Sequence, residues 1–221
     1  MGIVSNLEYI KSTLPDTVKL VAVSKFHPAV DIQEAYNAGQ LVFGESRMQE
    51  LDGKHTVLPQ DIEWHFIGHL QTNKVKSIIP YIHTIHSIDS WKLLAEIERQ
   101  AAAAERRVNC LLEIHIAQED SKYGLSEDEC FRLVEESDRN GLEYAKICGV
   151  MGMATYADDE TLIRNEFKQL KNIFTELKNR YFAKNDDFRE ISMGMSHDYQ
   201  IAVEEGSTMV RIGSSIFGER F

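Results

Sequence analysis

Short apolar runs alternate with longer segments of helical period along this 221-residue chain, and this alternation constrains the fold more than any other feature. Apolar, β-branched runs that are bounded by Gly, Ser, Lys or polar turns predict strands. Strands that alternate with helices form a parallel sheet through right-handed crossovers, and eight such units in about 220 residues favour a closed (β/α)8 barrel. The eight predicted strands are Leu20–Ser24, Leu41–Gly44, Trp64–Gly68, Ile82–Ile88, Val108–Ala117, Ala145–Met153, Glu190–Met195 and Met209–Ile212.

Helical signals fill the segments around these strands. The clearest is Asp158–Tyr181, where apolar residues recur at steps of one, three and four and form an apolar stripe. Ser126 with Glu129 three residues later predicts a capping box at a helix start. Trp91–Arg106 contains a run of alanines, and Ile3–Ser12 predicts an extra helix ahead of the first strand.

The chain predicts a single domain, residues 1–221. One α/β barrel commonly uses about 200–250 residues, and the sequence has only four prolines and no linker or low-complexity segment. An open flavodoxin-like or Rossmann sheet is the alternative architecture. The G-x-G-x-x-G fingerprint that a Rossmann sheet carries after its first strand is missing, which favours the barrel.

The charge balance argues against several partners. The chain has 24 Lys+Arg and 35 Asp+Glu, a formal net charge of −11, whereas nucleic acids and anionic membranes are bound largely through basic residues. No apolar run approaches the roughly 20 residues of a spanning helix, and the N-terminus lacks the pattern of a signal peptide. We therefore expect a cytoplasmic protein with no nucleic-acid or membrane partner.

Lysine follows the first predicted strand directly, at Lys25. Active groups of such barrels lie where the strands end, at the C-terminal face. A lysine at the mouth of an apolar barrel is partly desolvated, which disfavours its charged form and frees the amine to attack carbonyl groups. Lys25 is therefore either a Schiff-base lysine or a solvated residue that only ends the strand.

Glycine and serine cluster at the ends of the seventh and eighth predicted strands, in residues 192–196 and 211–215. The loops after these two strands commonly form a phosphate site in barrels of this kind. One Gly-Ser pair indicates only a turn, but two clusters together with Lys25 predict a ligand that carries both an aldehyde and a phosphate. Pyridoxal 5′-phosphate fits that description.

Arg211 adds to this hypothesis. A guanidinium cannot accept a proton, so beside the pyridine nitrogen it would act as a donor and keep that nitrogen unprotonated, which makes the ring a weaker electron sink. The alternative role for Arg211 is an ion pair with Asp or Glu at the barrel rim.

Several motifs that occur together carry a resemblance to a known family. The chain resembles the pyridoxal-phosphate homeostasis proteins, which are similar in structure to the barrel domain of alanine racemase. The resemblance spans essentially the whole chain and implies a barrel of that type. Its motifs are Ala22-Val23-Ser24-Lys25 with Pro28, Phe43-Gly44-Glu45 with Gln49-Glu50, Trp64-His65-Phe66-Ile67-Gly68 with Leu70-Gln71 and Asn73-Lys74, residues 192–196 with Asp198, and residues 206–213.

The resemblance implies roles for individual residues. Lys25 would bind pyridoxal phosphate as a Schiff base, and Arg211 would meet the pyridine nitrogen. Ser196, Gly213 and Ser214 would help to hold the phosphate. The sequence departs from the family at Ser46, where the family usually has Asn, so a ligand contact through that side chain would be shortened or replaced by water.

Three functions remain open at this stage: a binding protein for pyridoxal phosphate homeostasis, a racemase-like enzyme that uses the same cofactor, and a barrel that binds another phosphorylated metabolite without covalent chemistry. Racemisation needs acid–base groups on both faces of the substrate. In alanine racemase the second group is a tyrosine supplied through a second domain and the partner subunit, and this chain ends at Phe221, directly after strand eight. Tyr156 and Tyr199 are the remaining candidates. We expect a non-enzymatic, monomeric protein that can supply pyridoxal phosphate to apo-enzymes.

Histidine spacing does not predict a metal site. His65 and His69 are four residues apart, but the first lies in a predicted strand and the second beyond its end. His83 and His86 are three apart in a strand, where odd offsets point to opposite faces. Three cysteines without a CxxC pair predict neither a disulfide framework nor a structural zinc site.

Overall fold

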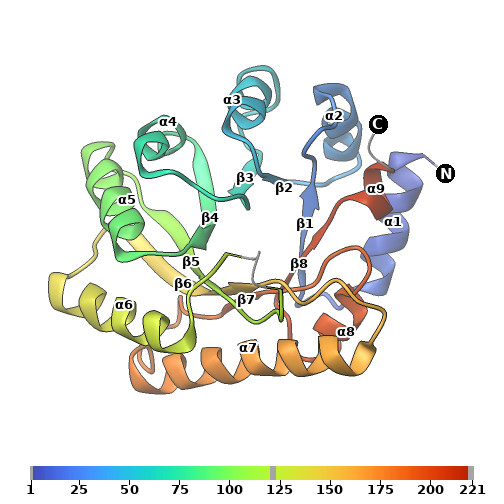
Figure 1. The fold of residues 1–221 in the computed structure, drawn as a ribbon. Coiled ribbons are helices and arrows are strands. Elements are labelled where there is room, and N and C mark those ends of the chain that lie inside the picture. The colour runs from blue at the N-terminus through green and yellow to red at the C-terminus, as the bar shows by residue number, and fades with distance from the viewer. Residues whose placement is uncertain (1, 120–122, 219–221) are drawn as a thin grey trace.

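The computed structural model describes residues 2–119 and 123–218. Its parallel strands pair in chain order, and the eighth pairs with the first, which closes the barrel and confirms the predicted (β/α)8 architecture (Figure 1). The strands are β1 (Lys19–Val23), β2 (Val42–Glu45), β3 (Glu63–Phe66), β4 (Ile82–Ile88), β5 (Val108–Ile114), β6 (Ala145–Gly152), β7 (Glu190–Ser192) and β8 (Met209–Ile212).

Helices surround the strands as an outer ring (Figure 1). The predicted extra helix at the N-terminus is present as α1, and it lies beside α9, where Asn6 Nδ2 donates to the Ile216 carbonyl at 3.0 Å. The helices of the described residues are α1 (Ile3–Thr13), α2 (Ala29–Asn37), α3 (Met48–Val57), η1 (Thr72–Lys74), α4 (Val75–Ile78), α5 (Trp91–Ala103), α6 (Glu127–Asn140), α7 (Glu160–Arg180), α8 (Tyr199–Glu204) and α9 (Ser214–Phe217). None of them is both long and apolar enough to cross a membrane.

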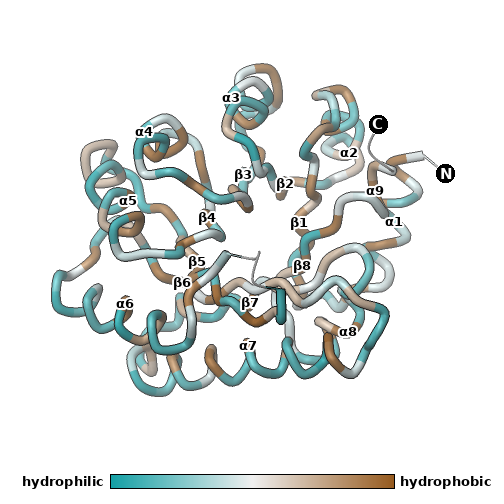
Figure 2. The backbone as a smooth tube through the Cα atoms, in the orientation of Figure 1, coloured by the Kyte–Doolittle hydropathy of each residue, from teal (hydrophilic) through white to brown (hydrophobic). Residues whose placement is uncertain are grey.

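Helix packing follows the sequence pattern. The apolar stripe of α7 is buried against the barrel, and the tube coloured by hydropathy shows hydrophilic and hydrophobic residues alternating along this helix (Figure 2). The predicted capping box opens α6: Ser126 Oγ accepts from the Glu129 amide, and the Glu129 carboxylate accepts from the Ser126 amide at 2.9 Å. These local signals fix where the two helices begin and which side faces the strands.

Some predicted elements are too long. β5 ends at Ile114 rather than Ala117, where its pairing with β6 stops at Gly152, and Ile114 also forms an isolated bridge with Leu125. β7 ends at Ser192 rather than Met195, because Gly194 has a φ of +96° and turns the chain out of the strand. The helix that begins at Trp91 ends early for a similar reason, since Glu105 has a φ of +51°.

Polar side chains occupy part of the barrel interior, where such barrels usually pack branched apolar residues. His86 Nδ1 of β4 lies 3.1 Å from Ser192 Oγ of β7, and these strands are not neighbours in the barrel, so the contact crosses its interior. His65 Nδ1 of β3 lies 2.9 Å from His86 Nε2, and Arg211 Nη1 of β8 donates to Ser192 Oγ at 2.6 Å. We call these four buried residues the cross-barrel network.

Candidate functional site

Lys25 lies two residues beyond the end of β1, because the strand ends at Val23 rather than at the predicted Ser24, and it is half buried. It sits in a tight turn in which the His27 amide donates to the Ser24 carbonyl at 3.1 Å. Phe26 has a φ of +69°, a conformation that is costly for a bulky residue. The Phe26 amide donates to Glu50 Oε2 at 2.7 Å, which helps to hold the turn that presents Lys25.

A buried ion pair supports this strand end from α3. Lys54 Nζ donates to the Ser24 carbonyl at 2.8 Å and to Glu45 Oε1 at 2.6 Å, and Ser24 Oγ donates to the same carboxylate oxygen at 2.6 Å. Burial raises the pKa of Glu45, and the ammonium of Lys54 opposes that rise. The sequence prediction missed Lys54, whose only signal is its position four residues after Glu50 on one helix.

The loops after β7 and β8 meet each other and the end of β1. The Gly213 amide donates to Ser196 Oγ at 3.3 Å. A Cβ on Gly213 would lie only 3.0 Å from the Val23 carbonyl, so this loop packs directly against β1 two residues before Lys25. Ser214 is exposed and begins α9. The structure thus brings the predicted phosphate-binding segments to the strand end that carries Lys25.

Arg211 lies inside the barrel and not at its rim. Its Nη1 donates to the Ser192 carbonyl at 2.8 Å as well as to Ser192 Oγ, and its Nη2 donates to the Gly152 carbonyl at 3.0 Å. Burial lowers the pKa of Arg211 to about 10, with the charges of Asp198 and Glu113 opposing, so the guanidinium stays positive at neutral pH. Among the described residues its hydrogen bonds go to these groups rather than to a carboxylate, unlike the ion pair considered as an alternative.

Glu113 of β5 is a further ionisable group near this arginine, and sequence reasoning missed it. It is buried, and that burial, together with the charge of Asp89, raises the pKa of Glu113 to about 7, while Arg211 lowers it. The available signal was an acid near the end of an otherwise mostly apolar strand. Glu113 therefore changes its charge close to neutral pH.

Ser46 and the two candidate tyrosines are also placed by the structure. Ser46 follows β2, and a Cβ on Gly68 would collide with its carbonyl, so both residues belong to the same end of the barrel. Tyr199 is buried, and its hydroxyl lies 3.0 Å from Thr13 Oγ1 of α1. Tyr156 is exposed and contacts the ring of His197 edge-on. Of these two tyrosines, Tyr156 therefore remains the candidate for approach to the mouth.

Comparison with known proteins agrees with this architecture. The family model described as alanine racemase, N-terminal domain, matches residues 2–220. The chain therefore belongs to the alanine racemase N-terminal domain family.

Similar proteins within this family share one name, pyridoxal phosphate homeostasis protein. The chain is 39% identical over 203 residues to the pyridoxal phosphate homeostasis protein of Aquifex aeolicus. The aligned region covers 91% of this chain and 87% of the relative. It is 34% identical to the protein of that name from Schizosaccharomyces pombe, with coverage of 98% and 92%. These matches confirm the resemblance that the motifs indicated.

Solved structures show the same relationship. PipY of Synechococcus elongatus PCC7942, determined with pyridoxal phosphate bound, superposes with a TM-score of 0.88 at 36% identity, covering 98% of this chain and all of PipY. Alanine racemase from Bartonella henselae superposes with a TM-score of 0.75 at 14% identity, which shows a shared fold. This chain matches 58% of the length of that racemase.

Proposed function

We propose that the protein binds pyridoxal 5′-phosphate at the carboxyl end of its barrel and serves the homeostasis of this cofactor. The observation that carries the proposal is the convergence of the segments after β1, β7 and β8, where Gly213 packs against the strand that presents Lys25. The bound cofactor of PipY and the names of the relatives support it.

The residues present fit this cofactor. Pyridoxal phosphate supplies an aldehyde that condenses with a primary amine, with loss of water. Lys25 Nζ is the amine that would form this Schiff-base linkage. The turn that carries Lys25 follows Ser24, whose carbonyl accepts a hydrogen bond from Lys54. Ser196, the Gly213 amide and Ser214 would bind the phosphate, and the lack of a Cβ at Gly213 lets its backbone approach an anion closely.

Arg211 would face the pyridine nitrogen and favour binding over catalysis. Three of its N–H groups donate to Ser192 and Gly152, which fixes the plane of the guanidinium, and a guanidinium has five N–H donors in all. Because it carries its charge at neutral pH and cannot accept a proton, it would leave the ring nitrogen unprotonated. The protein would then hold the cofactor without strongly activating substrates.

Covalent trapping tests this proposal. Protein incubated with pyridoxal phosphate should absorb visible light, and borohydride reduction should leave the pyridoxyl mass on the peptide that contains Lys25. Lys25→Ala should lose both signals, whereas Lys168→Ala, an exposed lysine on the outer helix α7, should keep them. Pyridoxyl mass on another peptide, or none at all, would overturn the assignment of Lys25.

A racemase-like activity is the second candidate, because exposed Tyr156 follows β6 and lies beside His197. Racemisation would require Tyr156 and Lys25 to act on opposite faces of the bound substrate. We propose instead a monomeric cytoplasmic protein that supplies the cofactor to pyridoxal-phosphate-dependent apo-enzymes. Amino-acid turnover at racemase rates that is lost in both Lys25→Ala and Tyr156→Phe would contradict the non-enzymatic proposal.

A further inference from the structure

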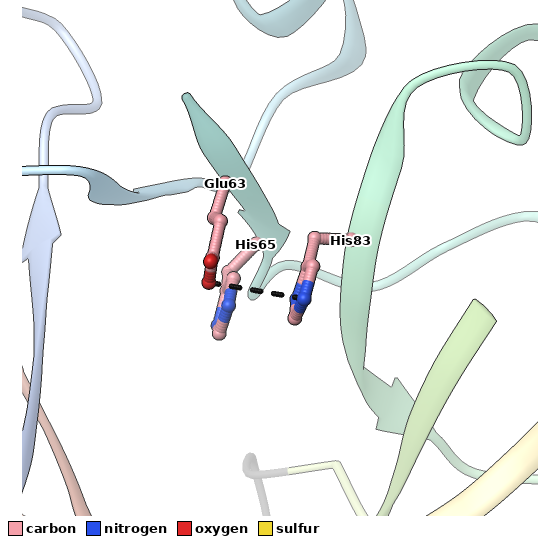
Figure 3. A group of neighbouring side chains, drawn as sticks. All are labelled: Glu63, His65 and His83. Atoms are coloured by element: carbon pink, nitrogen blue, oxygen red, sulfur yellow. Dashed lines mark ion pairs between the residues drawn. The ribbon is translucent and has the colours of Figure 1, made fainter. Parts of the chain in front are cut away.

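Three potential metal ligands converge at the amino-terminal end of the strands, opposite Lys25. They are Glu63 and His65 of β3 and His83 of β4, and one ligand atom from each lies within 4.8 Å of the others (Figure 3). Glu63 Oε2 and His83 Nε2 are 3.8 Å apart, and the imidazole rings of His65 and His83 are nearly parallel. Figure 3 shows the Glu63 carboxylate beside the His65 ring, with the His83 ring next to them on the neighbouring strand, and a dashed line joins Glu63 to His83.

His65 provides a second, independent observation. Its ring is fully buried, and its Nε2 has no hydrogen-bond partner among the described residues. Leaving a buried polar atom unpaired is unfavourable, so such an atom in a native fold calls for an unseen partner. The other nitrogen, Nδ1, is held by His86 at 2.9 Å, which orients Nε2.

His83 is oriented in the same manner. Its Nδ1 lies 2.8 Å from Thr84 Oγ1, which leaves Nε2 toward Glu63. Histidines that bind metals almost always engage their second ring nitrogen in a hydrogen bond, which fixes the tautomer and the ring orientation. Both histidines of the cluster therefore have the supporting contacts of metal ligands.

We propose that Glu63, His65 and His83 bind a zinc ion at this end of the barrel. Two imidazole nitrogens and one carboxylate form a ligand set that suits zinc, with water in the fourth position. At zinc bond lengths of about 2.0–2.1 Å, tetrahedral ligand atoms lie about 3.4 Å apart. The separation of 3.8 Å between Glu63 and His83 is close to that value. Because imidazole lone pairs lie in the ring plane, the partly exposed His83 ring would turn out of its parallel arrangement with His65 to bind the same ion.

The surroundings allow an ion to enter. Glu63, His83 and Thr84 line a cavity of about 280 Å³. The charged groups that line the same cavity balance: Lys19, Lys146 and Arg189 are positive, and Glu63, Asp187 and Glu190 are negative.

This site would communicate with the cofactor end through the cross-barrel network. When His65 Nε2 binds an ion, the ring proton is on Nδ1 and is donated to His86 Nε2. His86 then carries its proton on Nδ1 and donates it to Ser192 Oγ, the atom that also accepts from Arg211. Zinc binding thus selects the arrangement in which His65 donates to His86 and His86 donates to Ser192, rather than the reverse.

Calorimetric titration of the chelator-treated protein with zinc chloride tests the proposal. We expect one zinc ion per chain, and at least tenfold weaker binding in Glu63→Gln and His83→Gln. Both side chains are partly exposed, so these substitutions leave the core intact. The readout is metal binding, so the outcome is independent of whether the protein binds pyridoxal phosphate.

His69→Gln is the matched control, because His69 also pairs with a carboxylate, Asp89 at 3.2 Å, but belongs to a different cluster. It should bind zinc as the parent does, and circular dichroism should show that all variants are folded. Absence of stoichiometric zinc in the parent, or equal affinity in the parent and in folded Glu63→Gln and His83→Gln, would overturn the proposed site.

Discussion

Glu113 is a buried residue whose ionisation couples this barrel to pH. Its pKa is raised from the ordinary value near 4.5 to about 7, first by burial and then by Asp89. A carboxyl group whose pKa is higher in the folded state binds its proton more tightly when folded. The folded state therefore loses stability as the pH rises from about 4.5 to about 7.

Replacing Glu113 by Gln removes this titration. We expect the free energy of unfolding of Glu113→Gln, measured relative to the parent by urea denaturation, to increase by about 1–3 kcal/mol between pH 5 and pH 8. Glu8→Gln on the exposed side of α1 should show no such change. An equal difference between Glu113→Gln and the parent at both pH values would contradict the role assigned to burial.

Sequence reasoning placed some of these residues and missed others for a physical reason. The positions of Lys25 and Gly213 were predictable because the end of a strand is a local signal in the sequence. The carboxyl ends of all strands in such a barrel meet at one face. The partners of Arg211 were not predictable, because the network is closed by a contact between His86 and Ser192, which are 106 positions apart. Such a contact depends on the radius and register of the closed barrel.

At the scale of elements, the start of α7 depends on one side chain. Asp159 Oδ1 accepts from the amides of Thr161 and Leu162 at 2.9 and 3.2 Å. Glu166 of the same helix accepts from the Thr155 amide and hydroxyl in the loop after β6. The first turns of α7 therefore order this loop as well as the helix.

Asp159→Ala should lower the free energy of unfolding by about 1 kcal/mol, because it leaves amides at the helix start without a partner and removes a favourable charge there. Asp158→Ala is the matched control, an exposed aspartate one residue earlier in the chain, and it should change stability by less than half as much. Thermal unfolding of both variants followed by circular dichroism checks this. Equal losses in the two would show that Asp159 does not act as a cap.

Element types were more predictable than element ends. The stripe of α7 and the capping box of α6 are local patterns, and the structure contains both. The end of β7 was not predicted, because residues 193–195 are apolar or small and suit a strand, whereas tertiary packing bends the chain at Gly194. A Cβ there would lie 2.7 Å from the Ala202 side chain.

At the scale of the molecule, the proposed cofactor would join the two ends of the chain. β1 and β8 pair to close the barrel, and Lys25 and Gly213 follow these two strands. A ligand held by both would favour the closed barrel over any state in which this seam is open. The stabilisation follows mass action, since such a ligand binds the folded state alone.

Pyridoxal phosphate at 100 times its dissociation constant should therefore stabilise the protein by about 2.7 kcal/mol. Differential scanning fluorimetry should show a higher Tm with pyridoxal phosphate than with an equal concentration of pyridoxine 5′-phosphate, which lacks the aldehyde. Lys25→Ala should respond equally to the two compounds. No shift of the parent by pyridoxal phosphate would contradict a site at the seam.

The cross-barrel network also bears on how such a chain changes during evolution. Its four residues come from β3, β4, β7 and β8, and each satisfies the buried polar atoms of another. Replacing one by an apolar residue leaves its neighbours unpaired, whereas replacing all four together can be tolerated. We therefore expect the four residues to be either kept together or substituted together during evolution, although they lie on strands that are far apart in the sequence.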